Sequence, residues 1–362
     1  MKHQDEFRDG TLARRLAERL HRLADRPIRV MEICGTHTMA IFRHGLRSVL
    51  PANLGLVSGP GCPVCVTATE EIDRAVLLCR RPKVRVATFG DLIRVPGSRS
   101  SLKEEMAAGA KVSLVYSTLD AVKLARDHPE EEVVFLGIGF ETTAPTVAAA
   151  VKTAAASRLK NFSVLSAHKL LPPAMRALLS GGELNLDGFL CPGHVTTVIG
   201  TSAYRDIAAR YHTPCVVTGF EPVDILQGLV MLVELCRAGR FEVAIQYKRG
   251  AAAEGNPAAR AVMEEVFQPV DAPWRGLGLI PSSGLDLAEK YRDYNARRRF
   301  DLNVPPAREP AGCLCGEVLR GARTPPDCRL YRAACTPDTP IGPCMVSSEG
   351  ACAAYYRYDD RG

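Results

Sequence analysis

The sequence lacks any segment that is typical of a membrane span or an exported chain. No apolar run approaches the roughly 18 residues that a membrane-spanning helix needs. The first twenty residues are charged throughout and contain no apolar core of the kind that a secretory signal has. We therefore expect a cytoplasmic protein that does not associate with a membrane.

Nucleotide and nucleic-acid motifs are also missing. The sequence has no G-x₄-GK[ST] loop, and Gly137-Ile138-Gly139 lacks the third glycine of a dinucleotide fingerprint. The net charge of +6 comes from scattered basic residues, with one short run at Arg297–Arg299. Nucleic-acid binding would need a basic stripe with groove-reading elements, so we expect no nucleic-acid partner.

What is present is the composition of a globular protein with more than one domain. The 362 residues are 46% hydrophobic and 24% charged, and apolar strand patterns alternate with helical patterns up to about residue 245. This alternation predicts an α/β protein with two parallel-sheet domains that carry helices on both faces. We place the domains at residues 1–127 and 128–245, followed by a loop-rich, metal-dependent third domain at residues 246–362.

The 13 cysteines are many for a chain of this class. Their odd number and the missing signal argue against a secreted disulfide framework and favour metal binding or redox chemistry. The last fifty residues contain six of them without the paired C-x₂-C knuckles that are typical of zinc, so an iron–sulfur cluster is favoured over zinc. The spacing alone does not choose four ligands from Cys313, Cys315, Cys328, Cys335, Cys344 and Cys352.

Two further motifs contain cysteines with reactive surroundings. Cys62-Pro63-Val64-Cys65 lies between a predicted strand and a predicted helix, which suits either thiol exchange or metal binding. Cys34-Gly35-Thr36-His37 places a thiol near an imidazole, a pair that can act as a nucleophile or hold a soft metal such as ferrous iron. By contrast, Cys79, Cys215 and Cys236 lie in apolar patterns and are predicted to be core residues, and Cys191 is interpreted as structural.

Several polar residues directly follow predicted strands. Ligands of open parallel sheets bind beyond the carboxyl ends of the strands, so a single cleft between the two α/β domains is expected to gather these residues. They are Cys34, Cys62, Asp91, Glu141, His168, His194 and Glu221.

Seven segments spread over the chain together resemble the HypD family. The resemblance implies two α/β domains and a third domain with a [4Fe–4S] cluster, held in the pattern Cys-x₁₄-Cys-x₆-Cys-x₁₆-Cys that Cys313, Cys328, Cys335 and Cys352 fit. It further implies iron binding at Cys34 with His37 beside it, and a redox-active pair at Cys62 and Cys65. The segments are MEICGTHT (31–38), SGPGCPVCVT (58–67), FGDLIRVPG (89–97), GFETTAPT (139–146), CPGHVTTVIG (191–200), GFEPVDIL (219–226) and MVSSEGACAAYY (345–356).

The function that this resemblance implies is assembly of the Fe(CN)₂CO group of [NiFe]-hydrogenase. The family works with a HypC-like chaperone and a HypE-like cyanide donor and serves the hydrogenase large subunit indirectly. Asp91, Glu141 and Glu349 are candidates for supplying protons or orienting His37. The chain would be a redox-active assembly factor rather than a conventional turnover enzyme. Two alternatives remain open: a cluster-linked thiol–disulfide oxidoreductase resembling ferredoxin–thioredoxin reductase, and a binding scaffold with structural zinc.

Overall fold

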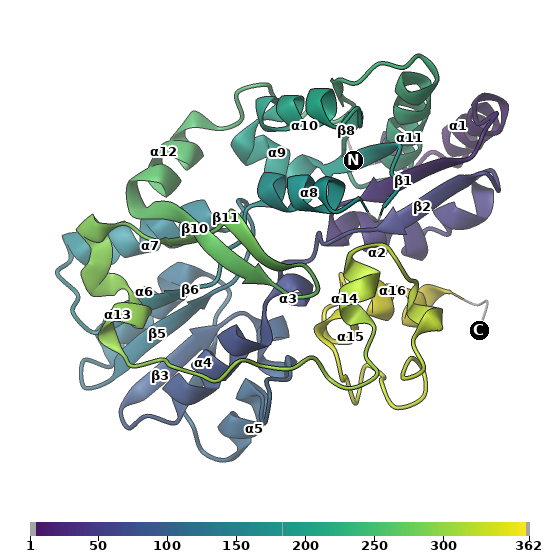
Figure 1. The fold of residues 1–362 in the computed structure, drawn as a ribbon. Helices are drawn as coiled ribbons and strands as arrows, with labels where there is room; N and C mark the ends of the chain where they lie inside the picture. The colour runs from purple at the N-terminus through teal and green to yellow at the C-terminus, as the bar shows by residue number, and fades with distance from the viewer. Residues whose placement is uncertain (1–4, 183, 360–362) are drawn as a thin grey trace.

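The computed structural model describes residues 5–182 and 184–359 and contains two parallel β-sheets (Figure 1). The strands nearest the centre of each sheet are buried on both faces, which is why they are nearly continuous apolar runs. The five-stranded sheet has the order β2 (Leu54–Ser58), β1 (Ile28–Glu32), β7 (Gly188–Pro192), β8 (Cys215–Thr218), β9 (Val243–Ile245). The four-stranded sheet has the order β4 (Val112–Leu114), β3 (Val84–Thr88), β5 (Glu132–Gly137), β6 (Phe162–Ser166).

Helices cover both faces of each sheet, as the sequence predicts. On the five-stranded sheet, one apolar core lies under α1, α2 and α11 and the other under α8 and α10. On the four-stranded sheet, α6 and α7 pack on one face and α4 on the other. The bounds are α1 (Gly10–Leu23), α2 (Gly35–Arg43), α4 (Thr69–Cys79), α5 (Leu102–Ala107), α6 (Thr118–Asp127), α7 (Ala144–Ala156), α8 (Leu171–Ser180), α9 (Gly193–Ile199), α10 (Arg205–Arg210) and α11 (Pro222–Arg237).

The sheets do not divide the chain at residue 127. Strand β3 pairs with β5 across that position, and β1 pairs with β7, more than 150 positions further along the chain. The chain therefore starts the five-stranded sheet, leaves it to build the whole four-stranded sheet, and returns at β7. Alternation of strands and helices does not reveal this order, because it says nothing about which strands pair.

Residues 246–362 also do not form one unit. Helix α12 (Pro257–Val266) and the antiparallel hairpin β10 (Phe267–Trp274) and β11 (Gly278–Leu287) contribute Met263, Phe267 and Leu285 to the core over α6 and α7. They complete the four-stranded unit because their apolar faces cover its sheet. Helix α13 (Ala296–Arg299) contacts β6, and an extended segment then leads to the cysteine-rich tail.

The tail, residues 313–358, is a small unit of short helices. It packs beneath α2 and beside α3 (Pro63–Val66), as Figure 1 shows in yellow. Its helices are α14 (Cys315–Leu319), α15 (Pro343–Val346) and α16 (Ala351–Tyr358). No helix in the described part of the chain is both long enough and apolar enough to cross a membrane.

Candidate functional site

Cys34 lies at the junction of the strand β1 and the helix α2, where it is the N-cap residue. The glycine-rich loop before α3 is pressed against it: the Gly35 amide donates to the Gly61 carbonyl over 3.0 Å, and Gly59 donates to the Glu32 carbonyl over 2.8 Å. A side chain at Gly61 would meet the Cys34 backbone nitrogen at 2.2 Å. Glycine at position 61 is therefore what allows the two cysteine loops to touch.

The thiol of Cys34 is buried beside a buried carboxyl group. The Cys34 amide donates to Glu32 Oε2 over 3.2 Å, and the Thr38 hydroxyl donates to Glu32 Oε1 over 2.5 Å. Burial raises the pKa of the Cys34 thiol to about 12 and the pKa of Glu32 to about 8. Both groups are therefore mainly protonated at neutral pH in the metal-free chain, and a bound cation would stabilise the thiolate form.

Cys62 is the N-cap residue of the short helix α3, Cys65 lies within this helix, and the two form a disulfide. Both side chains are buried, at 3% and 0% exposed, and the Cys65 amide donates to Cys62 Sγ over 3.2 Å. The predicted redox pair is thus close enough to cycle between dithiol and disulfide. The loop that carries it contacts the Cys34 loop, so these two predicted site motifs are brought together.

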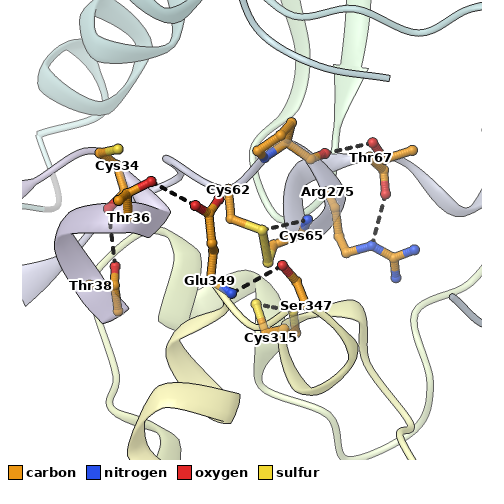
Figure 2. The surroundings of a disulfide bond; sticks show 12 residues. Cys34, Thr36, Thr38, Cys62, Cys65, Thr67, Arg275, Cys315, Ser347 and Glu349 are labelled. Atoms are coloured by element: carbon orange, nitrogen blue, oxygen red, sulfur yellow. Dashed lines mark hydrogen bonds between the residues drawn. A yellow bond between two sulfur atoms is a disulfide. The ribbon is translucent and has the colours of Figure 1, made fainter. Parts of the chain in front are cut away.

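The tail contacts the Cys34 loop through Glu349. Thr36 donates to Glu349 Oε1 over 2.6 Å, and a side chain at Gly35 would meet Glu349 Cβ at 2.6 Å. Figure 2 shows Glu349 between the Cys34 loop and the disulfide, with Cys315 of the tail below Cys65. Segments from the beginning and the end of the chain therefore meet at one site.

The six cysteines of the tail line one small pocket. Cys315 donates to Cys344 over 3.1 Å, and Gly342 lies close to the sulfur of Cys313. Six thiols that line one pocket are enough to supply the four thiolates of a [4Fe–4S] cluster, and Cys313, Cys328, Cys335 and Cys352 are among them.

Arg275 is a site residue that the sequence reasoning missed. It lies at the turn of the β10–β11 hairpin, where its amide donates to the Val66 carbonyl over 2.9 Å and its Nε donates to the Thr67 carbonyl over 3.0 Å (Figure 2). Its Nη1 pairs with Glu309 at 2.8 Å, and its side chain is only 2% exposed. Arg275 thus holds the end of α3 next to the tail. A lone arginine between apolar strands gives no signal of this role in the sequence.

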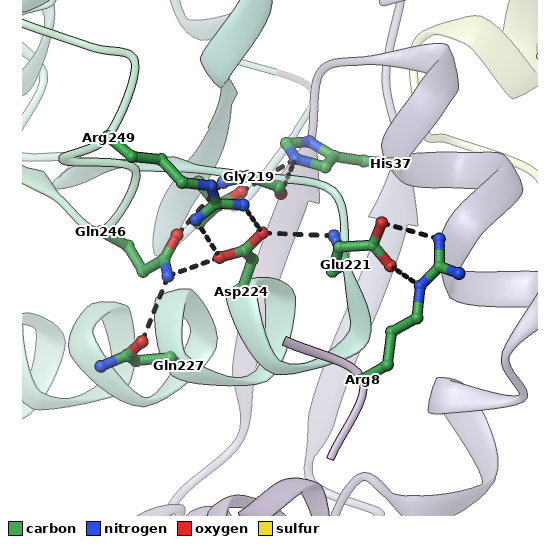
Figure 3. Close-up of polar contacts among 9 residues, drawn as sticks. Arg8, His37, Gly219, Glu221, Asp224, Gln227, Gln246 and Arg249 are labelled. Atoms are coloured by element: carbon green, nitrogen blue, oxygen red, sulfur yellow. Dashed lines mark hydrogen bonds and ion pairs between the residues drawn. The ribbon is translucent and has the colours of Figure 1, made fainter. Parts of the chain in front are cut away.

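His37 lies on the far side of α2 from the disulfide loop, against the end of β8. Its Nε2 lies 2.9 Å from the Gly219 carbonyl oxygen and 2.8 Å from the Thr218 hydroxyl (Figure 3). Its Nδ1 is buried without a hydrogen-bond partner among the described residues, and burial lowers the pKa of this imidazole to about 4. His37 is thus a neutral, buried imidazole.

The loop against His37 is held by a second ion pair that sequence reasoning missed. Asp224, which is fully buried, accepts from Arg249 Nη1 over 2.8 Å and from Gln246 Nε2 over 2.8 Å (Figure 3). The Gly219 amide donates to Gln246 Oε1 over 3.1 Å. Phe220 of the same loop stacks between the rings of His37 and His194, with centroid distances of 4.7 and 3.8 Å. His194 thereby joins the site.

The remaining predicted residues do not join it. Asp91 is exposed in a 3-10 turn after β3, and Glu221 pairs with Arg8 over 2.7 Å. Glu141 is buried beside α8, where burial raises its pKa to about 7, and His168 lines a separate pocket under the hairpin. None of the three candidate carboxylates hydrogen-bonds His37 in the described structure, because its Nε2 faces the Gly219 loop. The expected single cleft therefore gathers only part of the set.

Comparison with known proteins assigns the chain to a family. A family model described as "HypD: Hydrogenase formation hypA family" matches residues 11–359. The chain is 50% identical to the hydrogenase expression/formation protein HupD of Azotobacter chroococcum and 49% identical to the hydrogenase maturation factor HypD of Azotobacter vinelandii, in both cases over 99% of this chain and 97% of the relative. It is 48% identical to the hydrogenase maturation factor HypD of Rhizobium leguminosarum bv. viciae, over 99% of this chain and 96% of that protein. The chain therefore belongs to the HypD family of hydrogenase maturation factors.

Proposed function

We propose that this chain is a scaffold and redox protein that assembles the Fe(CN)₂CO group of [NiFe]-hydrogenase. The observation that carries the proposal is the contact of three sulfur-bearing segments: the Cys34 loop bonds the loop of Cys62 through Gly35 and Gly61, and the tail bonds it through Thr36 and Glu349. A protein that only bound a partner would not need these segments to converge.

Cys34 is the residue that we propose holds the iron under assembly, as a cargo ion, together with a thiolate of a HypC-like chaperone. Its thiol is buried, and burial disfavours the free thiolate. A soft cation offsets that penalty, because it binds the thiolate and releases the proton. The neutral imidazole of His37 contacts the Gly219 carbonyl, and Glu349 accepts a hydrogen bond from Thr36, so both residues fix the start of α2 next to the cysteine.

The Cys62 and Cys65 pair is proposed to release cyanide from a thiocyanate carried by a HypE-like donor. The two thiols and the thiocyanate R–S–CN give R–SH, HCN and the Cys62–Cys65 disulfide, so that two electrons pass from the dithiol to the sulfur–carbon bond. Restoring the dithiol then takes two electrons and two protons.

The tail is the proposed source of those electrons. Cys313, Cys328, Cys335 and Cys352 are the residues that would hold a [4Fe–4S] cluster, which supplies electrons one at a time when bound. Cys315 and Cys344, whose sulfurs lie 3.1 Å apart, share an apolar core with Cys62 and Cys65. As a disulfide they could take up two electrons and two protons, and the resulting dithiol could then reduce the Cys62–Cys65 disulfide by exchange.

The decisive test is infrared spectroscopy on the chain purified anaerobically with its HypC-like partner. We expect bands of bound CN and CO in the wild type and their loss in Cys34→Ala. The matched control is Cys79→Ala, in the core under α4, which should keep the bands. A wild-type complex that is loaded with iron but shows no such bands would contradict the scaffold proposal.

The alternative, a cluster-linked thiol–disulfide oxidoreductase, is favoured by the neighbouring thiol pairs in the same core. It predicts that Cys34→Ala leaves all activity intact, because that mechanism does not use Cys34. Iron and acid-labile sulfide analysis separates both proposals from a zinc scaffold, since a zinc scaffold would contain neither.

A further inference from the structure

A cavity of about 260 Å³ lies under the β10–β11 hairpin, at the carboxyl end of β6. Its wall is formed by α4, by the segment after β6 and by the two hairpin strands. None of the cysteines of the proposed iron and thiol site lines it. Carboxyl ends of parallel strands are where α/β proteins usually bind ligands, yet the proposed function leaves this pocket without a role.

The carboxylates that line the cavity each have a partner. Glu71 is buried and pairs with Arg74 at 2.9 Å and with Arg297 at 2.5 Å. Asp286 accepts from Asn295 Nδ2 over 2.9 Å, and Asp271 accepts from the Ser282 amide over 2.9 Å. Two arginines therefore match the charge of Glu71, and the other two carboxylates accept hydrogen bonds from neutral groups.

Among the charged residues that line the pocket, Lys169 is the one whose side chain has no hydrogen-bond or ion-pair partner among the described residues. It is 2% exposed, and its ammonium makes no hydrogen bond or ion pair with any described residue. Its backbone is fixed by a bond from its amide to the Gly139 carbonyl over 2.9 Å and by a bridge to Gly284 of the hairpin. The preceding residue, His168, adds a buried Nε2 that also lacks a partner among the described residues.

We propose that this cavity binds a small anion through a carboxylate or a tetrahedral oxyanion, with Lys169 as its main ligand and Arg74 and Arg297 beside it. A buried ammonium without a counter-ion is costly, and an anionic oxygen removes that cost while filling the space in front of it. The two guanidiniums are only partly buried, so each keeps N–H groups for a ligand. This inference goes beyond the proposed function and does not depend on it.

The electrostatics of Lys169 agree with this assignment. Burial lowers the pKa of the Lys169 ammonium to about 8, and Arg297 and Arg74 lower it further, against the opposing effect of Glu71. A bound anion adds the missing negative charge and keeps the ammonium protonated at neutral pH.

The test is isothermal titration of the full chain, purified anaerobically, with inorganic phosphate and separately with malonate, at matched ionic strength. We expect saturable binding of at least one probe, and the stronger of the two identifies the source as a phosphate or a carboxylate compound. Lys169→Met should weaken binding about tenfold or more, because a charge-assisted hydrogen bond is lost. The matched control is Lys160→Met, an exposed lysine at the other end of β6, which should leave binding unchanged.

Two results would overturn the proposal: saturable binding of neither probe, or equal affinity in the wild type and in Lys169→Met. If Lys169→Met does not fold, as judged by circular dichroism, Arg74→Gln replaces it. Arg74 lies at the opening of the pocket with a side chain 23% exposed, so its substitution is compatible with folding. Unchanged binding in Arg74→Gln would then overturn the proposal.

Discussion

The cysteines of the α/β body, which comprises the two sheets and their helices, and the cysteines of the tail are held in place by different structural elements. Cys34 and Cys62 are placed by loops that follow paired strands, and backbone hydrogen bonds join those loops directly. Between residues 300 and 342, by contrast, the only regular elements are α14 and one 3-10 turn at Pro325–Asp327. The body therefore holds its thiols through its own backbone hydrogen bonds, whereas we expect the tail to depend on the cluster that we propose its thiols bind. The presence of a cysteine in the sequence does not show whether the backbone around it or a bound group holds its thiol in place.

The largest effect is expected where the tail loses its proposed cluster. Cys335→Ala should abolish iron and sulfide binding and open the tail to limited proteolysis, while the two sheets stay resistant, because metal binding supplies folding energy only to the segment that holds it. Cys236→Ala, in α11 of the body, is the control and should keep the iron. A Cys335→Ala protein with full iron content and a resistant tail would show that the tail supports itself.

The contact between the two body loops gives the next largest effect. In Gly61→Ala the new methyl group would lie 2.2 Å from the Cys34 nitrogen and 2.3 Å from the Ile33 carbonyl carbon. Backbone atoms cannot yield as a flexible side chain does, so we expect a loss of about 3 kcal/mol in the free energy of unfolding, measured with urea. Gly90→Ala, where the methyl group meets nothing within 4 Å, should change it by less than about 0.5 kcal/mol.

Low pH should lower the free energy of unfolding of the α/β body because some of its histidines are buried. Burial lowers the pKa of His168 to about 3, so the unfolded chain binds a proton below pH 6.5 that the folded chain does not. The free energy of unfolding should thus fall with decreasing pH from about 6.5, by about 1.4 kcal/mol per pH unit for each such histidine. In His168→Gln, the free energy of unfolding, measured with denaturant at several pH values, should change less steeply with pH. The difference should equal the contribution of one proton. An unchanged slope would mean that His168 takes up its proton in the folded state.

The smallest effect is expected where the body and the tail touch. The hydrogen bond from Thr36 to Glu349 should give a coupling energy of about 1 kcal/mol in a double-mutant cycle of Thr36→Val and Glu349→Ala. A control cycle that combines Thr36→Val with the distant Lys160→Met should give no coupling energy. Zero coupling in the first cycle would mean that this hydrogen bond does not stabilise the docked tail.

The sequence predicted the class of the fold better than its connectivity. Alternating apolar strands and amphipathic helices are local patterns, and the structure confirms parallel sheets with helices on both faces. The pairing of β1 with β7 and of β3 with β5 is not local, so no pattern in the sequence marks it. The same holds for the hairpin at 267–287, which the sequence predicts to belong to a loop-rich third domain, whereas Phe267 and Leu285 join the core of the four-stranded unit.

At the site, residues inside distinctive motifs were found and isolated charges were missed. Cys34, Cys62 and Cys65 stand in glycine-rich cysteine motifs, and the structure brings them together. Arg275 and Asp224 act through contacts with segments that are distant or separated by a loop, which a single sequence does not display. The choice of four ligands among the six tail cysteines stays a prediction, since all six line one pocket.

The chain leaves the five-stranded sheet after β2 and returns to it at β7, and this affects the order in which the protein folds during synthesis. Strand β1 lies between β2 and β7, so during synthesis the strand that positions Cys34 lacks one neighbour until residue 192 has left the ribosome. The intervening residues can pair into the four-stranded sheet first, and α12 and the β10–β11 hairpin cover it once they emerge. Glu349 emerges last and closes against Gly35. The Cys34 loop therefore gains its contact with Glu349 only after the strands of both sheets have been synthesised.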